Sequence, residues 1–217
     1  MIRENLIRIK NELPAGVKLL AVSKFQPDEA IMEAYEAGQR LFGENRPQEF
    51  AGKAVRLPDD IEWHFIGHLQ TNKLKMVLPY ATLVESVDSL HLLEEIDKWG
   101  RANGKIIRVL LEMHIGAEKT KQGFHEEEIL DILFRADSFK SVCFCGLMGM
   151  ASHTDDEGLI RADFTRIASY MDYLRDLFPE LDSFTELSIG MSDDYRIALE
   201  CGSTLVRIGS SIFGPRQ

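Results

Sequence analysis

The chain has 217 residues, 45% of them hydrophobic, so it is long enough to bury one large core. Its formal net charge of -10 disfavours nucleic acids and anionic membranes as main partners, because neither is attracted to an acidic surface. Nothing in the sequence resembles a linker, and we expect a single domain over residues 1–217.

The cysteines and the N-terminal segment indicate in which cellular compartment the protein is found. Cys143, Cys145 and Cys201 are an odd number and suggest no disulfide framework, which is typical of a reducing environment. The N-terminal segment is charged where a signal peptide would be apolar, and no apolar run approaches the roughly 20 residues of a membrane-spanning helix. We therefore expect a cytoplasmic protein with no membrane partner.

The first elements are a helix and a strand. Apolar residues from Ile2 to Leu13 recur at spacings of three and four, which predicts an amphipathic helix that Pro14 ends. The apolar run that follows reads as a buried strand, and Pro27 suits the first turn of the next helix. Lys24 therefore lies where the first strand gives way to a loop.

From there strand-like and helix-like segments alternate to the end of the chain. Eight strands separated by helices, in a length near the lower bound for the fold, predict a protein of the α/β class with a single-domain (β/α)8 TIM barrel. A doubly wound open sheet is the alternative, but it would show a glycine-rich fingerprint after the first strand, and none is present there. The predicted strands are 17–25, 40–43, 61–66, 82–87, 106–115, 142–150, 184–189 and 204–208.

In such a barrel the functional groups gather at the carboxyl ends of the strands. The residues that this rule places on one rim are Lys24, Asn45, His68, Met150, Ser192 and Gly209. His64 and His68 are four apart on a strand and its turn, a spacing that does not bring side chains together as it would on a helix. We expect no metal there and interpret His64 as a hydrogen-bonded structural residue.

Two stretches after the last two strands have the composition of an anion site. Residues 188–194 and 207–214 combine glycines, hydroxyl side chains and the start of a helix, which together predict a phosphate-binding cradle. The alternative is two ordinary glycine-containing turns.

A strand-end lysine opposite a phosphate site suggests Schiff-base chemistry. A free lysine titrates near ~10.4, so a nucleophilic one needs desolvation or cationic neighbours, and a barrel interior can supply both. Two classes fit the residues. One is an aldolase whose Lys24 attacks a phosphorylated carbonyl substrate. The other is a protein whose Lys24 holds pyridoxal 5'-phosphate (PLP) as an internal aldimine.

Five separated motifs in this sequence resemble those of a known protein family. Ala21-Val22-Ser23-Lys24, the segments 42–46 and 63–73, and the stretches 188–194 and 207–214 closely resemble, in the same order, the PLP homeostasis protein family. The resemblance covers the whole chain. It implies a barrel of the alanine racemase N-terminal type (PLP fold type III), with PLP on the strand-one lysine, no established reaction and a role in vitamin B6 balance. It also implies PLP as the partner, cofactor-free PLP enzymes as recipients, and a monomer.

Carried over by position, the resemblance implies a cofactor site. Lys24 would hold the aldimine, Arg207 would face the pyridine nitrogen, and the phosphate would lie against Ser192 and the backbone of Gly209 and Ser210. The other two implied contacts are the amide of Met191, toward the phosphate, and Asn45, near the ring in the barrel mouth.

Arg207 affects which reactions a bound PLP ring could support. A permanently charged guanidinium disfavours protonation of the pyridine nitrogen, so the ring would be a weak electron sink. Racemases with such an arginine add a C-terminal β domain and a catalytic tyrosine, whereas this sequence ends at Gln217, just after the eighth strand. We expect PLP binding without substantial turnover. The alternative is a PLP-dependent amino-acid racemase or lyase of fold type III.

Overall fold

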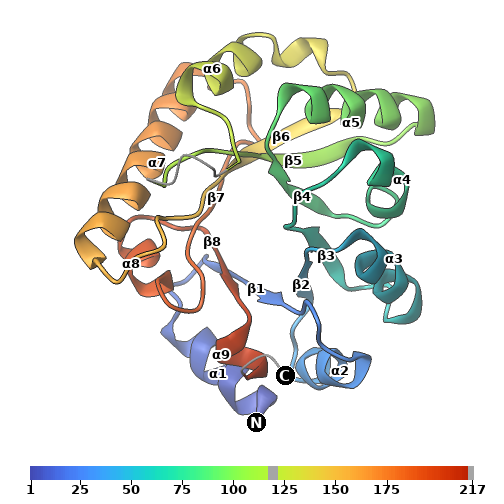
Figure 1. The fold of residues 1–217 in the computed structure, drawn as a ribbon, viewed down its shortest axis with the longest axis vertical. Helices are drawn as coiled ribbons and strands as arrows, with labels where there is room; N and C mark the ends of the chain where they lie inside the picture. The colour runs from blue at the N-terminus through green and yellow to red at the C-terminus, as the bar shows by residue number, and fades with distance from the viewer. Residues whose placement is uncertain (117–121, 215–217) are drawn as a thin grey trace.

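The computed structural model describes residues 1–116 and 122–214. In this part of the chain, eight parallel strands close into a barrel in which each strand pairs with the next and β8 pairs with β1 (Figure 1). The predicted (β/α)8 barrel is confirmed, and the open sheet was wrong because no strand is left at an edge. The strands are β1 (Lys18–Val22), β2 (Leu41–Glu44), β3 (Glu62–Phe65), β4 (Leu83–Val87), β5 (Ile107–Glu112), β6 (Val142–Met148), β7 (Glu186–Ser188) and β8 (Leu205–Ile208).

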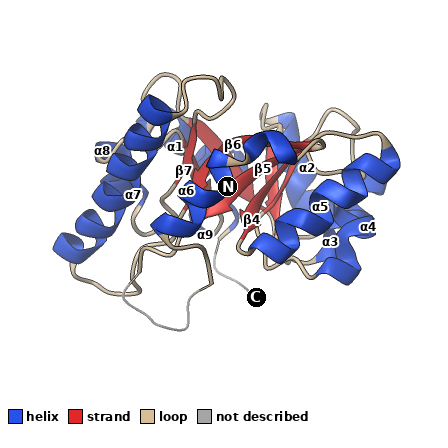
Figure 2. Ribbon diagram, turned by 90° about the horizontal axis from the view of Figure 1, so that it is seen from above, coloured by secondary structure: helices blue, strands red, loops and turns tan. Residues whose placement is uncertain are grey.

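The helices form a layer around the strands (Figures 1 and 2). Gln217, on which the sequence ends, lies outside the described residues. The helices are α1 (Ile2–Glu12), α2 (Asp28–Glu36), α3 (Pro47–Arg56), α4 (Leu74–Val77), α5 (Leu90–Asn103), α6 (Glu126–Phe134), α7 (Glu157–Leu177), α8 (Tyr195–Glu200) and α9 (Ser210–Phe213), with 3-10 turns at Thr71–Lys73 and Ala136–Ser138.

The N-terminal helix α1 covers the barrel between its last and first strands. It packs beside α2 and α9, so the two ends of the described chain lie together (Figure 1). Leu6 and Ile9 of α1 are fully buried against the barrel, as the apolar periodicity predicts. The Asn5 side chain donates a hydrogen bond to the Ile212 carbonyl over 3.0 Å and so fixes α1 to α9.

Several helix ends follow directly from local sequence. Pro47 opens α3, where its fixed φ and missing N–H are tolerated. The Ser89 hydroxyl caps α5 by accepting a hydrogen bond from the Leu92 amide, and Gly104 ends the helix in the left-handed conformation. Helix α4 is short and follows the 3-10 turn Thr71–Lys73 directly.

Helix α3 is held to the barrel by aromatic packing. Phe50, fully buried on α3, contacts Phe65 with ring centroids 5.6 Å apart and Trp63 at 6.1 Å, both edge-to-face. Such pairs contribute roughly 0.5–1.5 kcal/mol each beyond the area they bury. The wall of the barrel at β2 and β3 is therefore a rigid support for the residues that α3 carries.

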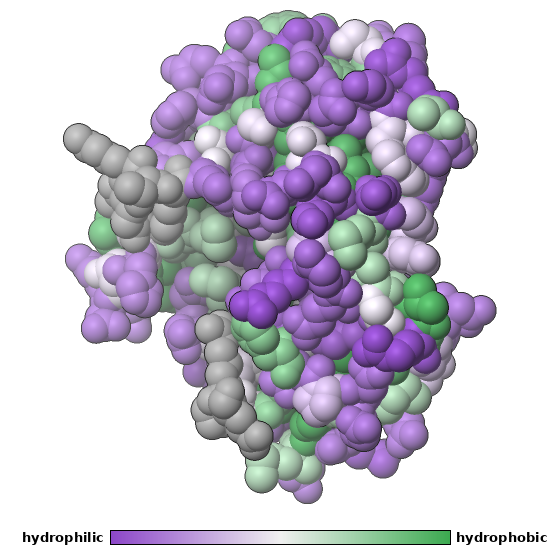
Figure 3. Space-filling model, turned by 45° about the vertical axis from the view of Figure 1, so that its right-hand side comes forward, coloured by the Kyte–Doolittle hydropathy of each residue, from purple (hydrophilic) through white to green (hydrophobic). Residues whose placement is uncertain are grey.

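The face of the molecule shown in Figure 3 is largely hydrophilic, as expected from the formal net charge of -10. Within residues 1–116 and 122–214, no helix is long and apolar enough to cross a membrane. All three cysteines are free thiols, and Cys143 and Cys145 lie side by side on β6 with their sulfurs 3.8 Å apart.

Candidate functional site at the barrel mouth

All eight strands run in the same direction, so their carboxyl ends meet at one end of the barrel, which we call the mouth. Lys24 follows β1, Asn45 follows β2, Ser192 follows β7 and Gly209 follows β8. The predicted site residues are thus carried by neighbouring strands, since β8 pairs with β1 and β1 with β2.

The turn after β1 carries Lys24 in a tight and strained conformation. The strand ends at Val22, earlier than predicted, and the Gln26 amide donates to the Ser23 carbonyl over 3.0 Å. Lys24 is half-buried in this turn. The next residue, Phe25, has φ of +64°, a left-handed conformation that side chains other than those of glycine, asparagine and aspartate rarely adopt.

The two glycine-containing stretches lie side by side. The Gly209 amide donates to the Ser192 hydroxyl over 3.3 Å, and the Arg207 amide donates to the Gly190 carbonyl over 2.9 Å. Gly190 has φ of +94°, and a side chain there would also meet Ala198 of α8. The structure therefore brings Ser192 and Gly209 together, as a common cradle requires.

The cradle also adjoins the strand that leads to Lys24. A Cβ atom on Gly209 would lie 3.1 Å from the Val22 carbonyl oxygen, so the backbones after β8 and β1 are close. Among the described residues, the amides of Ser210 and Ser211 donate no hydrogen bond, which leaves two donors at the start of α9. Donors in this position suit an anion.

Met191 differs from its neighbours because its amide is already hydrogen-bonded within the protein. Its amide donates to the Asp194 carboxylate over 2.6 Å, and its side chain is exposed. Burial raises the pKa of Asp194, while the hydrogen bond from the Met191 amide opposes that rise. The predicted use of the Met191 amide for a phosphate therefore requires that Asp194 release it.

Arg207 points into the barrel and is 5% exposed. One terminal nitrogen, Nη1, donates to the Ser188 carbonyl at 2.7 Å and to the Ser188 hydroxyl at 2.6 Å, and Nη2 donates to the Gly149 carbonyl at 2.9 Å. Burial lowers the pKa of Arg207, and the charges of Glu85 and Glu112 oppose this. The guanidinium is thus held by Ser188 of β7 and by Gly149, which follows β6.

A buried carboxylate that the sequence reasoning missed lies beside this arginine. Glu85 of β4 accepts hydrogen bonds from the Ser188 hydroxyl at 2.6 Å, lies 2.5 Å from His64 Nδ1, and is 3.9 Å from Arg207 Nη1. Burial pushes the pKa of Glu85 upward, but the bonds and charges of His64, Arg207 and Ser188 outweigh it and leave the pKa lowered. His64 is confirmed as a hydrogen-bonded buried residue.

Glu112 is a second carboxyl that the sequence did not single out. It is the last residue of β5, on the side of the barrel opposite β1. It is 6% exposed. Burial raises its pKa to about 7, with a contribution from the charge of Asp88, while Arg207 and His68 oppose the rise. His68 itself is bonded to Asp88, with Nδ1 2.8 Å from Oδ2. The mouth therefore contains a carboxyl that can hold or release a proton near neutral pH.

Asn45 has an unused acceptor. Its side-chain oxygen Oδ1 is buried and has no hydrogen-bond partner in the structure. The loop that carries it packs closely on the turn after β3, since a Cβ atom on Gly67 would overlap the Asn45 backbone. A buried polar atom without a partner is rare and costly, so a donor group on a ligand would satisfy it.

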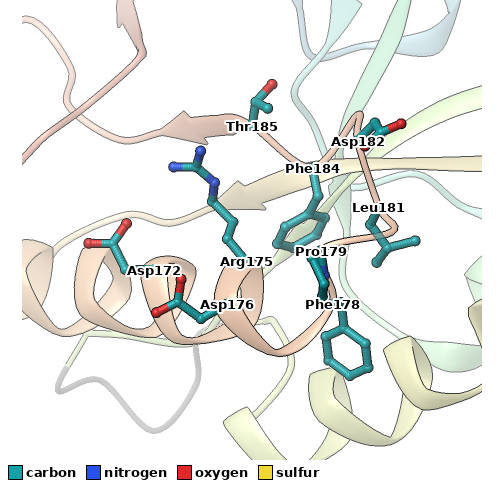
Figure 4. A pocket seen from close by; sticks show the side chains of 9 residues that line it. All are labelled: Asp172, Arg175, Asp176, Phe178, Pro179, Leu181, Asp182, Phe184 and Thr185. Carbon is teal, nitrogen blue, oxygen red and sulfur yellow. The ribbon is translucent and has the colours of Figure 1, made fainter.

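A cavity near the end of α7 lies away from this site. It has a volume of 640 Å³ and is formed where α7 ends and the chain returns to β7, at the opposite end of the barrel (Figure 4). Asp172, Arg175 and Asp176 of α7 line one side, and Phe184 and Thr185 line the other. It contains none of the predicted site residues.

Comparison with known proteins places the chain among relatives of similar length. The family model described as alanine racemase, N-terminal domain, matches residues 1–217. The pyridoxal phosphate homeostasis protein of Pasteurella multocida is 39% identical over 210 residues, covering 94% of this chain and 88% of its own. The protein of that name from Schizosaccharomyces pombe is 37% identical over 204 residues, covering 93% and 85%.

Solved structures agree with the fold. PipY of Synechococcus elongatus, solved with PLP bound, superposes with a TM-score of 0.91 at 35% identity, over 99% of this chain and 100% of that one. Alanine racemase of Streptomyces coelicolor has a TM-score of 0.78 at 22% identity, over 99% of this chain and 58% of that one. The second likeness concerns the fold alone.

Proposed function

This chain belongs to the pyridoxal phosphate homeostasis protein family, and we propose that it binds PLP in the mouth of its barrel and serves intracellular PLP homeostasis. The observation that carries the proposal is the close approach of the end of β1, two residues before Lys24, to the cradle of Ser192 and Gly209. It is supported by PipY, a relative with PLP bound that shares the fold over 99% of this chain.

The residues of the mouth fit a phosphorylated aromatic aldehyde. The amides of Ser210 and Ser211 offer donors for the phosphate, and the unpartnered Asn45 Oδ1 offers an acceptor beside the ring. Bound PLP supplies an aldehyde that a lysine amine can attack. Lys24 would hold the cofactor covalently by condensing with that aldehyde and releasing one water molecule.

Arg207 favours holding the cofactor over turnover. Facing the pyridine nitrogen, its guanidinium would disfavour a second positive charge on the ring, and the electron sink would be weak. Ser188 and Gly149 fix the guanidinium through three hydrogen bonds. We further propose that the protein acts as a monomer in the cytoplasm and delivers PLP to cofactor-free enzymes.

A titration of the purified protein with PLP tests this function. We expect the absorbance of PLP to shift to longer wavelength and to saturate at one PLP per chain. Lys24→Ala should show no such shift, whereas Lys75→Ala, which removes an exposed lysine of α4, should behave as the wild type. A wild-type protein that leaves the PLP spectrum unchanged would refute the proposed function.

Glu112 favours one alternative, a PLP-dependent racemase or lyase. A carboxyl with a pKa of about 7 in the mouth is a possible acid or base. With PLP-loaded protein in deuterated water, we expect amino acids to exchange their α-hydrogen far more slowly than the ~1 per second typical of enzymes. Exchange at or above that rate, abolished by Glu112→Gln, would establish the alternative.

A further inference from the structure

A group of buried charges lies behind the turn that carries Lys24. Lys53 of α3 is 3% exposed, and its ammonium group makes three hydrogen bonds. It donates to the Ser23 carbonyl at 2.9 Å, to Glu44 Oε1 at 2.8 Å and to Glu49 Oε1 at 2.6 Å. The Ser23 hydroxyl also donates to Glu44 Oε1 at 2.6 Å. We call Lys53, Glu44 and Glu49 the buried triad, although the Glu49 side chain is 22% exposed.

The buried triad holds the backbone on both sides of Lys24. Lys53 binds the carbonyl of Ser23, the residue before it. Glu49 accepts a hydrogen bond from the amide of Phe25, the residue after it, over 2.8 Å. Since α3 is packed rigidly on the barrel through Phe50, these two contacts fix the turn to a firm support.

The turn needs such support because Phe25 is strained. A left-handed conformation costs a residue with a Cβ atom roughly 1–2 kcal/mol. Burial of the Phe25 ring does not offset this strain energy, since the residue is 48% exposed. Its ring contacts the exposed guanidinium of Arg46 at 4.5 Å. The conformation persists only if hydrogen bonds around it outweigh the strain, and Glu49 provides one of them.

The stability of the fold does not by itself explain why the charges of the buried triad are present. Burial raises the pKa of Glu44, an effect that Lys53 opposes, and Glu44 Oε2 has no hydrogen-bond partner. Replacing buried ion pairs by apolar side chains of similar volume is often neutral or stabilising. Charges that make no clear contribution to stability, yet hold the backbone on either side of one lysine, are better explained by the position of that lysine.

We propose that Lys53 is a positioning residue that holds the strained turn after β1 in the conformation from which Lys24 binds PLP. This inference rests on the proposed function. Lys53 does not touch the cofactor. It acts through the Ser23 carbonyl and, together with Glu49, through the Phe25 amide.

Lys53→Met is the first test, read out as the apparent affinity for PLP in the absorbance titration. We expect binding at least 10-fold weaker than in the wild type, with an unchanged circular dichroism spectrum. Arg56→Met is the matched control, since Arg56 lies on the same helix in an exposed ion pair with Asp28, and it should bind PLP within twofold of the wild type. Wild-type affinity in Lys53→Met would overturn the inference and leave the proposed function intact.

A second pair of variants separates positioning from stability, and it serves if Lys53→Met fails to fold. Glycine accepts the φ of Phe25 without strain, so Phe25→Gly should be at least as stable as Phe25→Ala. A glycine turn is also less restricted, so Phe25→Gly should bind PLP at least threefold more weakly than Phe25→Ala. If PLP affinity instead follows stability, the turn has only a structural role and the inference is wrong.

The two proposals fail in distinguishable ways. If wild-type protein shows no Lys24-dependent spectral shift, the proposed function is wrong whatever the variants of the triad do. If the wild type binds PLP through Lys24 but Lys53→Met binds it equally tightly, or PLP affinity in the Phe25 pair follows stability, only the positioning inference fails.

Discussion

Replacing Arg207 with methionine is expected to destabilise the cofactor-free protein by about 3 kcal/mol or more, the usual cost of removing one partner from a buried charge network. The substitution removes the donors to the Ser188 and Gly149 carbonyls and takes a cation away from the fully buried Glu85. Unpaired buried acceptors each cost about 1–3 kcal/mol. Urea denaturation at neutral pH measures the loss.

The matched control is Arg166→Met. Arg166 pairs with Glu126 over 2.8 Å, but both side chains are exposed to solvent, and such pairs contribute about 0–1 kcal/mol. If Arg207→Met were no more destabilising than Arg166→Met, the guanidinium would not hold β8 to β7 and to the end of β6, and the proposed place of Arg207 beside the cofactor would lose its support.

Glu112→Gln is expected to change how stability depends on pH. The carboxyl has a pKa near 4.5 in the unfolded chain and about 7 in the folded one, so the folded protein binds the extra proton between these values. The wild type should therefore lose stability as pH rises from about 4.5 to 7, by about 3 kcal/mol when the loss is complete. The glutamine variant carries no charge to bury.

Denaturation of the cofactor-free proteins across pH measures this effect. Glu112→Gln should match the wild type near pH 4.5 and exceed its stability by about 3 kcal/mol above pH 7. Glu62→Gln, at an exposed position on β3, should keep the pH dependence of the wild type. Parallel curves for Glu112→Gln and the wild type would show that Glu112 does not bury a charge in the mouth.

The order and number of the strands could be predicted because each is a short apolar run between helical segments. The ends of β4 and β8 were also predicted, at Val87 and Ile208, but the ends of other strands were not. β1, β5 and β6 end two or three residues before their predicted limits, because the residues that follow, such as Ser23 and Ile115, stay buried after the strand pairing stops. An apolar pattern reports burial and does not distinguish a strand from a buried loop.

The candidate site was predictable where barrel topology alone decides the position. Lys24, Ser192 and Gly209 follow strands that are neighbours in any such barrel. The structure joins Gly209 to Ser192 and places Gly209 beside Val22, two residues before Lys24. Glu85 of β4 and Glu112 of β5 were missed. A strand buried on both faces shows no alternation that separates the barrel interior from the helix layer, so a charged residue within it has no predictable partner.

Borohydride reduction of the PLP-loaded protein, followed by mass mapping of its peptides, tests the central claim most directly. Reduction makes the bond between the lysine amine and the cofactor permanent, so the labelled residue can be identified. The account predicts one PLP-derived mass increase per chain, located on Lys24 and absent from Lys24→Ala. A label on another lysine, or the same extent of labelling in Lys24→Ala, would contradict it.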